Sequence, residues 1–232
     1  MTTYEEAIKY LSGAYETSGG VPDVTKDRAP VNETCTLAAH GLGRDIPVGI
    51  SNRHVHLSRQ DLDTIFGTGY ELTRIKDLSQ PGQFASKETV TLAGPKGAIE
   101  NVRILGPVRG QTQVELLAGD CFRLGVKQCV RLSADLDGSP GVTVIGPKGS
   151  VCKDKGAIVA KRHIHMTPKD AESYGVRDGQ IVGIEITGER GGVYRETIIR
   201  VSETSALDCH VDTEEANAMG INPGLNVKLI TL

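Results

Sequence analysis

The sequence contains no tryptophan, and aromatic residues make up only 4% of its 232 positions. A core with so few large rings must rely on Val, Ile, Leu and Ala, and the 28 glycines add many tight turns. This composition favours short strands over long helices. Long apolar runs are missing as well. Because no stretch approaches 18 consecutive apolar residues, we expect no membrane-spanning helix and no membrane partner.

Strong net charge and a cysteine framework are also absent. A net charge of −3 provides no broad basic surface, which disfavours nucleic acid as a partner. The five cysteines are odd in number and show no C-x-x-C spacing, so neither a disulfide framework nor a thiolate zinc knuckle is expected. The first residues lack the basic and apolar layout of a secretory signal. These features predict a globular protein of the reducing cytoplasm.

The first region, residues 1–45, differs from the rest of the chain. Apolar residues between Met1 and Thr17 recur at the i, i+3, i+4 spacing of an amphipathic helix. The following residues, up to about Asp45, mix Pro, Gly, Thr and charge without a sustained period, which is typical of a linker. We therefore expect this helix to be an appendage on a core that begins near Ile46.

From Ile46 onward the chain alternates short β-branched runs with Gly- and Pro-containing turns. The clearest runs are residues 89–92, 142–145, 180–186, 195–201 and 226–232. Their spacing is that of small barrels or sandwiches. The predicted fold is mainly β: a duplicated pair of small β-barrels with short helices, plus the N-terminal amphipathic helix. The first barrel domain is expected at 46–150 and the second at 151–232.

An internal duplication is the most informative feature of the sequence. Residues 51–61, S-N-R-H-V-H-L-S-R-Q-D, align without gaps with residues 160–170, A-K-R-H-I-H-M-T-P-K-D. Ser58 and Thr167 are predicted helix N-caps, with Asp61 and Asp170 three residues later at the positive end of the helix dipole. Pro168 falls at the favourable first helical position. Each Arg-His-x-His motif is therefore expected to end a strand and lead into a short helix.

The two His-x-His pairs predict two metal sites. Side chains two apart on a strand point to the same face, so His54 with His56, and His163 with His165, each form a two-imidazole claw. The duplication also indicates a third donor, because Glu115 and His210 are each followed by Gly ten residues later. Three ligands of this kind suit zinc and leave a coordination position open. We therefore expect two zinc ions per chain.

Other interpretations of the same residues stay open at this point. An isolated His-x-His pair is more often exposed, or satisfied by hydrogen bonds, than bound to metal. The alternative to metal binding is thus a set of structural histidines that cap helices. If metal is bound, the spacing fits a zinc metallohydrolase of a small ester or phosphoester as well as another zinc enzyme. It also fits a non-enzymatic scaffold with structural zinc.

The motifs resemble those of the phosphotransacylases associated with bacterial microcompartments, also called phosphate propanoyltransferases. The resemblance covers residues 46–232, and the segments that carry it are 49–58, 105–109, 161–165 and 210–217. It implies reversible transfer of a short acyl group, propanoyl or acetyl, between coenzyme A and inorganic phosphate. It also implies two six-stranded β-barrels with two zinc ions between them, and location inside a microcompartment.

The same resemblance implies roles for individual residues. One zinc would be held by His54, His56 and Glu115, and the other by His163, His165 and His210. Residues expected near coenzyme A are Ser51, Lys76, Arg103, Leu105, His210 and Asn217. Arg109 is expected at the phosphate, with Ser133 nearby, because a guanidinium binds phosphate through two parallel hydrogen bonds. Zinc would convert the coenzyme A thiol to a thiolate that attacks the acyl phosphate.

Partners are expected on two levels. The enzyme would bind coenzyme A, acyl-CoA or acyl phosphate, and phosphate, and it is expected to form a homo-oligomer. Residues 1–20 are interpreted as an encapsulation peptide whose apolar stripe docks on a microcompartment shell protein. The alternative is that this helix packs against its own barrel or frames a dimer.

Overall fold

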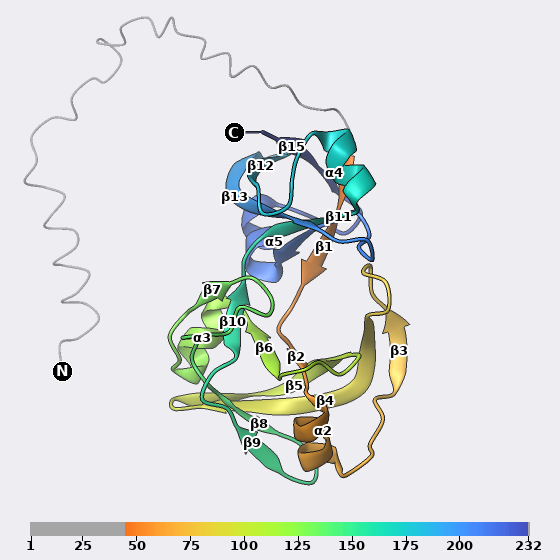
Figure 1. Cartoon of the computed structure of the whole chain (residues 1–232). Helices are drawn as coiled ribbons and strands as arrows, with labels where there is room; N and C mark the ends of the chain where they lie inside the picture. Colours follow the sequence, from red (N-terminus) through yellow and green to blue (C-terminus); the bar gives the residue numbers. More distant parts are fainter. Residues whose placement is uncertain (1–44, 232) are drawn as a thin grey trace, which may run out of the picture. The chain divides into compact units, whose positions relative to one another are not determined.

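A computed structural model describes residues 45–231, and Figure 1 shows the order of the elements along the chain. The predicted helix of residues 1–17 and the linker to residue 45 lie outside the described residues. The described chain is mainly β, as predicted, with four short helices. Among residues 45–231 no helix is both long enough and apolar enough to cross a membrane.

Six strands form a closed barrel in the order β1-β14-β11-β13-β12-β15. Their bounds are β1 Asp45–Ser51, β11 His163–Met166, β12 Ile181–Ile186, β13 Gly192–Val201, β14 Asp208–Asp212 and β15 Asn226–Ile230. Predicted strands 180–186, 195–201 and 226–232 correspond to β12, β13 and β15.

The remaining strands form a second, curled sheet in the order β7-β10-β6-β2-β5-β4-β8-β9, with β3 paired to β4. Their bounds are β2 His54–His56, β3 Arg74–Asp77, β4 Phe84–Gly94, β5 Gly97–Gly106, β6 Gln113–Leu116, β7 Val130–Arg131, β8 Thr143–Ile145, β9 Ser150–Cys152 and β10 Ala157–Ala160. Predicted strands 89–92 and 142–145 lie in β4 and β8.

The two sheets are related by the duplication, but only one is closed. The strand sequence β10-β6-β2-β5-β4 corresponds pair by pair to β1-β14-β11-β13-β12. In the barrel, β15 pairs with both β1 and β12 and completes the ring. In the curled sheet that place is divided between β7, which pairs with β10, and β8, which pairs with β4. The curled sheet therefore resembles a barrel whose closing strand is split.

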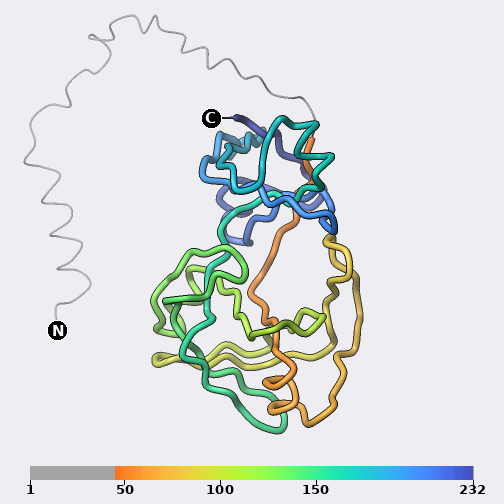
Figure 2. The backbone as a smooth tube through the Cα atoms, in the orientation of Figure 1, coloured from red at the N-terminus to blue at the C-terminus, as the bar shows by residue number. Residues whose placement is uncertain are grey.

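The strand that precedes each Arg-His-x-His motif belongs to the sheet of the other repeat. Strand β1 pairs in parallel with β14, and β10 pairs in parallel with β6. The chain consequently passes between the sheets twice, at residues 52–53 and 161–162, as the tube in Figure 2 shows. Sheet membership thus does not change at residue 150. The division into two domains, 46–150 and 151–232, stays a prediction.

Each motif leads from a strand into a helix, as predicted. Helices α2 (Arg59–Phe66) and α4 (Pro168–Tyr174) are capped by Ser58 and Thr167, whose hydroxyl oxygens accept hydrogen bonds of 3.1 Å from the backbone N–H three residues later. Helices α3 (Ala118–Leu124) and α5 (Thr213–Met219) follow the third-donor strands β6 and β14. The two repeats therefore share strand–helix junctions at matching positions.

Each sheet surrounds its own apolar core. The curled sheet packs around residues such as Leu57, Leu92 and Ile104, all fully buried, and the barrel around Ile164, Ile184 and Ile199. Ile46 of β1 belongs to the barrel core. This contact anchors β1, the swapped strand, which precedes the first motif but pairs within the sheet of the second repeat. Because each core is complete on its own side, the polar motif residues are left at the crossings between the sheets.

Candidate metal centres and substrate cavity

Two groups of three side chains that could hold a metal ion occur among the described residues. They are His54, His56 and Glu115 in the curled sheet, and His163, His165 and His210 in the barrel. Within each group the donor atoms all lie within 4.8 Å of one another. These are the two sets that the duplication predicts, and the structure brings each set together.

Strand pairing explains why each group forms. In the curled sheet, β2 pairs antiparallel with β6 and places His54 opposite Glu115. In the barrel, β11 pairs antiparallel with β14 and places His163 opposite His210. Alternation along β2 and β11 then brings the second histidine of each pair to the same face. The third donors therefore occupy equivalent positions in the two repeats, although one is a carboxylate and the other an imidazole.

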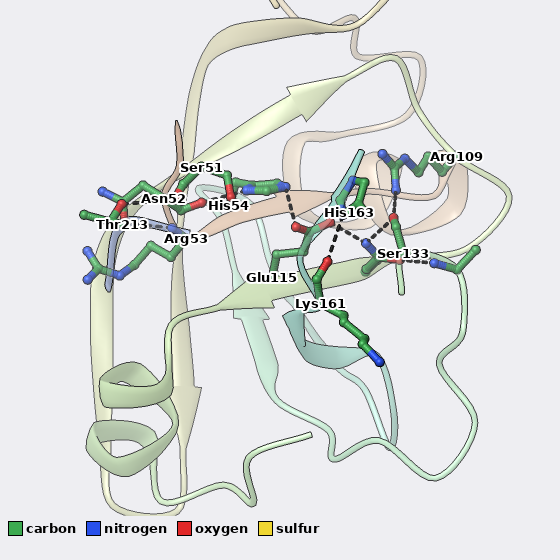
Figure 3. A network of polar contacts seen from close by, with 12 residues as sticks. Ser51, Asn52, Arg53, His54, Arg109, Glu115, Ser133, Lys161, His163 and Thr213 are labelled. Atoms are coloured by element: carbon green, nitrogen blue, oxygen red, sulfur yellow. Dashed lines mark hydrogen bonds and ion pairs between the residues drawn. The ribbon is translucent and has the colours of Figure 1, made fainter. Parts of the chain in front are cut away.

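Backbone carbonyls orient the first histidine of each pair in the same way. His54 Nδ1 lies 2.7 Å from the carbonyl oxygen of Asn52, and His163 Nδ1 lies 2.8 Å from that of Lys161 (Figure 3). A carbonyl oxygen only accepts, so Nδ1 carries a proton and Nε2 is the nitrogen that faces the other donors. Such a contact orients the ring of a metal-ligating histidine. His54 Nε2 faces the Glu115 carboxylate at 3.4 Å.

The chemistry of both donor sets fits a metal ion. His163 Nε2 and His165 Nε2 lie 3.1 Å apart. Two nitrogens on one tetrahedral zinc, each at 2.0–2.1 Å, are about 3.3 Å apart. In the other group, the buried Nδ1 of His56 has no hydrogen-bond partner. The short nitrogen–nitrogen contact and the unpaired His56 nitrogen suit a shared cation, and His210 Nε2 in addition lies 3.0 Å from Asp208 Oδ2.

The pKa values of four of the six donors also suit metal binding, whereas the Glu115 carboxylate raises the pKa of His54 against the effect of burial. Burial lowers the pKa of His56 to about 3, that of His163 to about 4 and that of His165 to about 3. Burial alone would raise the pKa of Glu115, but the His54 ring outweighs it and holds that pKa well below its ordinary value. Neutral imidazoles and an ionised carboxylate are the forms that bind metals.

Both groups line one cavity of about 670 Å³. Among residues 45–231, its lining carries five cationic side chains and a single carboxylate, that of Glu115. The cations are Arg53, Arg103, Arg109, Lys161 and Arg200. In a chain with a net charge of −3, this concentration of positive charge favours an anionic ligand.

Arg109 extends across the cavity wall from the segment after β5. Its guanidinium Nη1 donates to Ser133 Oγ at 3.0 Å (Figure 3). Its backbone N–H donates to the Leu57 carbonyl at 2.8 Å. Burial lowers its pKa, partly offset by the charge of Glu115. The guanidinium makes no ion pair with a carboxylate among residues 45–231, so its charge remains available to a bound anion.

Of the other residues expected near coenzyme A, Ser51, Arg103, Leu105 and His210 line the cavity. Arg103 Nη1 donates to the carbonyls of Ser86 and Lys87 at 3.1 and 2.8 Å. Lys76 on β3 and Asn217 on α5 are exposed and do not line it. Their roles stay predictions. Cys209 is fully buried and belongs to the barrel core, as its alternation with His210 predicts.

Arg200 is a cavity residue that the sequence analysis did not identify. It lies on β13 opposite His165, and its guanidinium makes no hydrogen bond or ion pair within the described part of the chain. Its charge contributes to the lowered pKa of Arg109, after burial. Strand alternation could have identified Arg200. The neighbouring Ile199 is fully buried, so Arg200 must face away from that core.

A family model described as phosphate propanoyltransferase matches residues 47–222, which include both motifs and all six donors. The chain belongs to the phosphate propanoyltransferase family. A relative of that name from Thermotoga maritima is 62% identical over 180 residues, covering 77% of this chain and 86% of the relative. A relative of the same name from Rhodobacter capsulatus is 57% identical, covering 76% of this chain and 82% of the relative. Another from Clostridioides difficile is 50% identical, covering 80% of this chain and 88% of the relative. This phosphate propanoyltransferase family member is therefore an acyltransferase.

Proposed function

We propose that the protein is a zinc-dependent phosphotransacylase that moves a short acyl group, propanoyl or acetyl, reversibly between coenzyme A and inorganic phosphate. The observation that carries the proposal is the single cavity in which two three-donor groups face several cationic side chains. Coenzyme A, acyl phosphate and phosphate are all anionic, so the charge of the lining matches the substrates. Family membership favours this reaction over a metallohydrolase or a structural scaffold.

The reaction requires a sulfur and a phosphate oxygen to exchange at one carbonyl carbon. In the direction of acyl phosphate synthesis, a phosphate oxygen forms the new C–O bond and the thioester C–S bond breaks. The proton lost from phosphate ends on the coenzyme A thiol. In our proposal His54, His56 and Glu115 hold one zinc, and His163, His165 and His210 hold the other. Bound zinc supplies a Lewis acid that lowers the pKa of a thiol and polarises a carbonyl or phosphoryl oxygen.

The arginines of the cavity orient the phosphate. Arg109 is held by Ser133 with part of its guanidinium still free, so it can offer a planar pair of donors to two phosphate oxygens. Arg200 has no competing partner within residues 45–231 and adds a second cation. Arg103, whose Nη1 is already bonded to carbonyls, presents its remaining donors to the phosphates of coenzyme A.

We also propose that residues 1–20 direct the enzyme to a bacterial microcompartment. The support is the apolar periodicity of residues 1–17 together with membership of the catalytic core in this family. An apolar stripe of this kind suits docking into a groove of a shell protein. We expect the core to function as a homo-oligomer.

The decisive experiment measures thiol release from propanoyl-CoA with and without phosphate, before and after treatment with a chelator. We expect release that requires phosphate, stops after metal removal and returns with Zn²⁺. Thiol release that is independent of phosphate would indicate a hydrolase and contradict acyl transfer to phosphate. Full activity in metal-free protein would contradict the zinc dependence but not the acyl transfer to phosphate.

A further inference from the structure

The arginine of each Arg-His-x-His motif makes the same kind of contact in both repeats. Arg53 Nε donates to Asp120 Oδ2 at 2.7 Å, and Arg162 Nη1 pairs with Glu215 Oε1. Asp120 is five residues after the third donor Glu115, and Glu215 is five residues after the third donor His210. The duplication therefore repeats an ion pair as well as the six donors.

Both acids sit in the first turn of the helix that follows the third donor. Asp120 Oδ2 accepts from the backbone N–H of Leu117 at 3.1 Å, which ties it to the end of β6. Glu215 Oε2 accepts from the N–H of Asp212 at 3.4 Å, and Asp212 Oδ1 accepts from the N–H of Glu215 at 2.7 Å. Each acid thus joins its helix start to the last residues of the third-donor strand.

Each arginine, in turn, immediately precedes the first histidine of its pair. Arg53 leads into β2 and Arg162 into β11, at the two places where the chain passes between the sheets. Arg162 is fixed further by a 2.7 Å hydrogen bond from Nη2 to the Arg195 carbonyl. The ion pair therefore connects the start of the His-x-His strand to the end of the strand that carries the third donor.

From this arrangement we propose that Arg53 and Arg162 are positioning residues that set the third donor of each group against its two histidines. Arg53 acts on Glu115 and Arg162 on His210. The ion pairs are sheltered: the side chains of Asp120 and Glu215 are only 7% and 23% exposed, so solvent screens them less than surface pairs. This inference rests on the proposed metal binding by the two groups.

Arg162 gives the cleaner test because, unlike Arg53, it does not line the substrate cavity. The probe is Zn²⁺ alone, and the readout is its affinity by competition with a chromophoric chelator. Arg162→Met is prepared in two backgrounds. In His54→Ala only the group of His163, His165 and His210 remains complete, and in His163→Ala only the group of His54, His56 and Glu115 remains.

We expect Arg162→Met to weaken Zn²⁺ binding by about 10–100-fold in the His54→Ala background, the usual effect of losing a residue that orients a metal ligand. In the His163→Ala background we expect no measurable change. Lys155→Met removes an exposed ion pair with Asp137 and should leave affinity unchanged in both backgrounds. A merely stabilising ion pair would not distinguish the two groups.

Glu215→Gln provides a second variant if Arg162→Met does not fold. It removes the charge that Arg162 meets while leaving an oxygen that accepts the N–H of Asp212. The same selective loss of affinity is expected. No loss of Zn²⁺ affinity, or an equal loss in both backgrounds, would overturn the positioning role but not the proposed metal dependence. A parent protein that binds no Zn²⁺ would overturn the proposed metal dependence and this inference together.

Discussion

Gly49 offers a direct way to displace a single proposed metal donor. It lies on β1 opposite His210 of β14, at the pairing that brings the swapped strand against the barrel group. A methyl group added at Gly49 would stand 2.7 Å from Asp208 Oδ2, 2.9 Å from His210 Cδ2 and 3.1 Å from His210 Nε2. The φ of Gly49 is not in the left-handed region, so the backbone itself accepts alanine.

The size of the displacement follows from these distances. Carbon atoms in ordinary contact are about 3.5–4.0 Å apart, so the His210 ring must withdraw by about 0.6 Å or more. Metal–ligand distances tolerate only about 0.2 Å. The side chain of His210 is 25% exposed and can move, but that of Asp208, which makes the shortest contact, is only 5% exposed and must shift as well. Destabilisation should therefore fall within the roughly 1–3 kcal/mol that overpacking costs.

We expect Gly49→Ala to lose about one Zn²⁺ per chain at limiting free zinc while keeping a cooperative melt. The assay is elemental analysis after equilibration in a zinc buffer, with thermal unfolding measured on the same samples. Gly192→Ala is the matched control, because its added methyl group would meet only Tyr194 at 3.8 Å, an ordinary contact. If Gly49→Ala retained zinc like the parent, His210 would not be a donor at this position.

Three further predictions test other parts of the structure. Arg109→Lys should keep the fold and reduce phosphate-dependent turnover by at least about tenfold, since the charge persists without the two-donor geometry; saturation with phosphate at the parental rate would show that Arg109 does not hold the phosphate. Asp61→Asn should lower the melting temperature at pH 7. Burial alone would raise the pKa of Asp61, but hydrogen bonds from Thr112 and Lys153 lower it below 3.8, so its stabilisation is present above that pH and lost below it. The deficit of Asp61→Asn should therefore shrink as the pH falls below about 4, and a deficit that is independent of pH would contradict this reasoning. Removing Met1–Gly20 should leave zinc content, melting temperature and acyl transfer unchanged while abolishing co-purification with shells, whereas a lower melting temperature or lost activity would assign these residues to the catalytic core.

The candidate site was predictable because its signals are local and repeated. Two histidines separated by one residue share a strand face whatever the fold. The duplication then indicates the third donors, because Glu115 and His210 occupy equivalent positions in the two repeats. The caps at Ser58 and Thr167 follow from the same local rules. Each of these inferences needs only a few neighbouring residues.

Features that depend on distant pairing were not predictable in this way. Nothing near Ile46 indicates that β1 joins the barrel of the second repeat, because that choice depends on β14 and β15. Arg200 resembles any strand arginine until its register with His165 is known. The family resemblance implied two six-stranded barrels, but the curled sheet stays open because its closing position is split between β7 and β8.

The exchange of β1 has a consequence for the nascent chain. The Ser51 hydroxyl donates to the carbonyl of Val211, which is 160 residues later, so β1 leaves the ribosome long before its partners exist. The curled sheet can complete its pairing once β10 has been made, whereas β1 must wait with an unpaired edge for β14 and β15. Synthesis therefore delivers the histidines of the first repeat early and the cavity last.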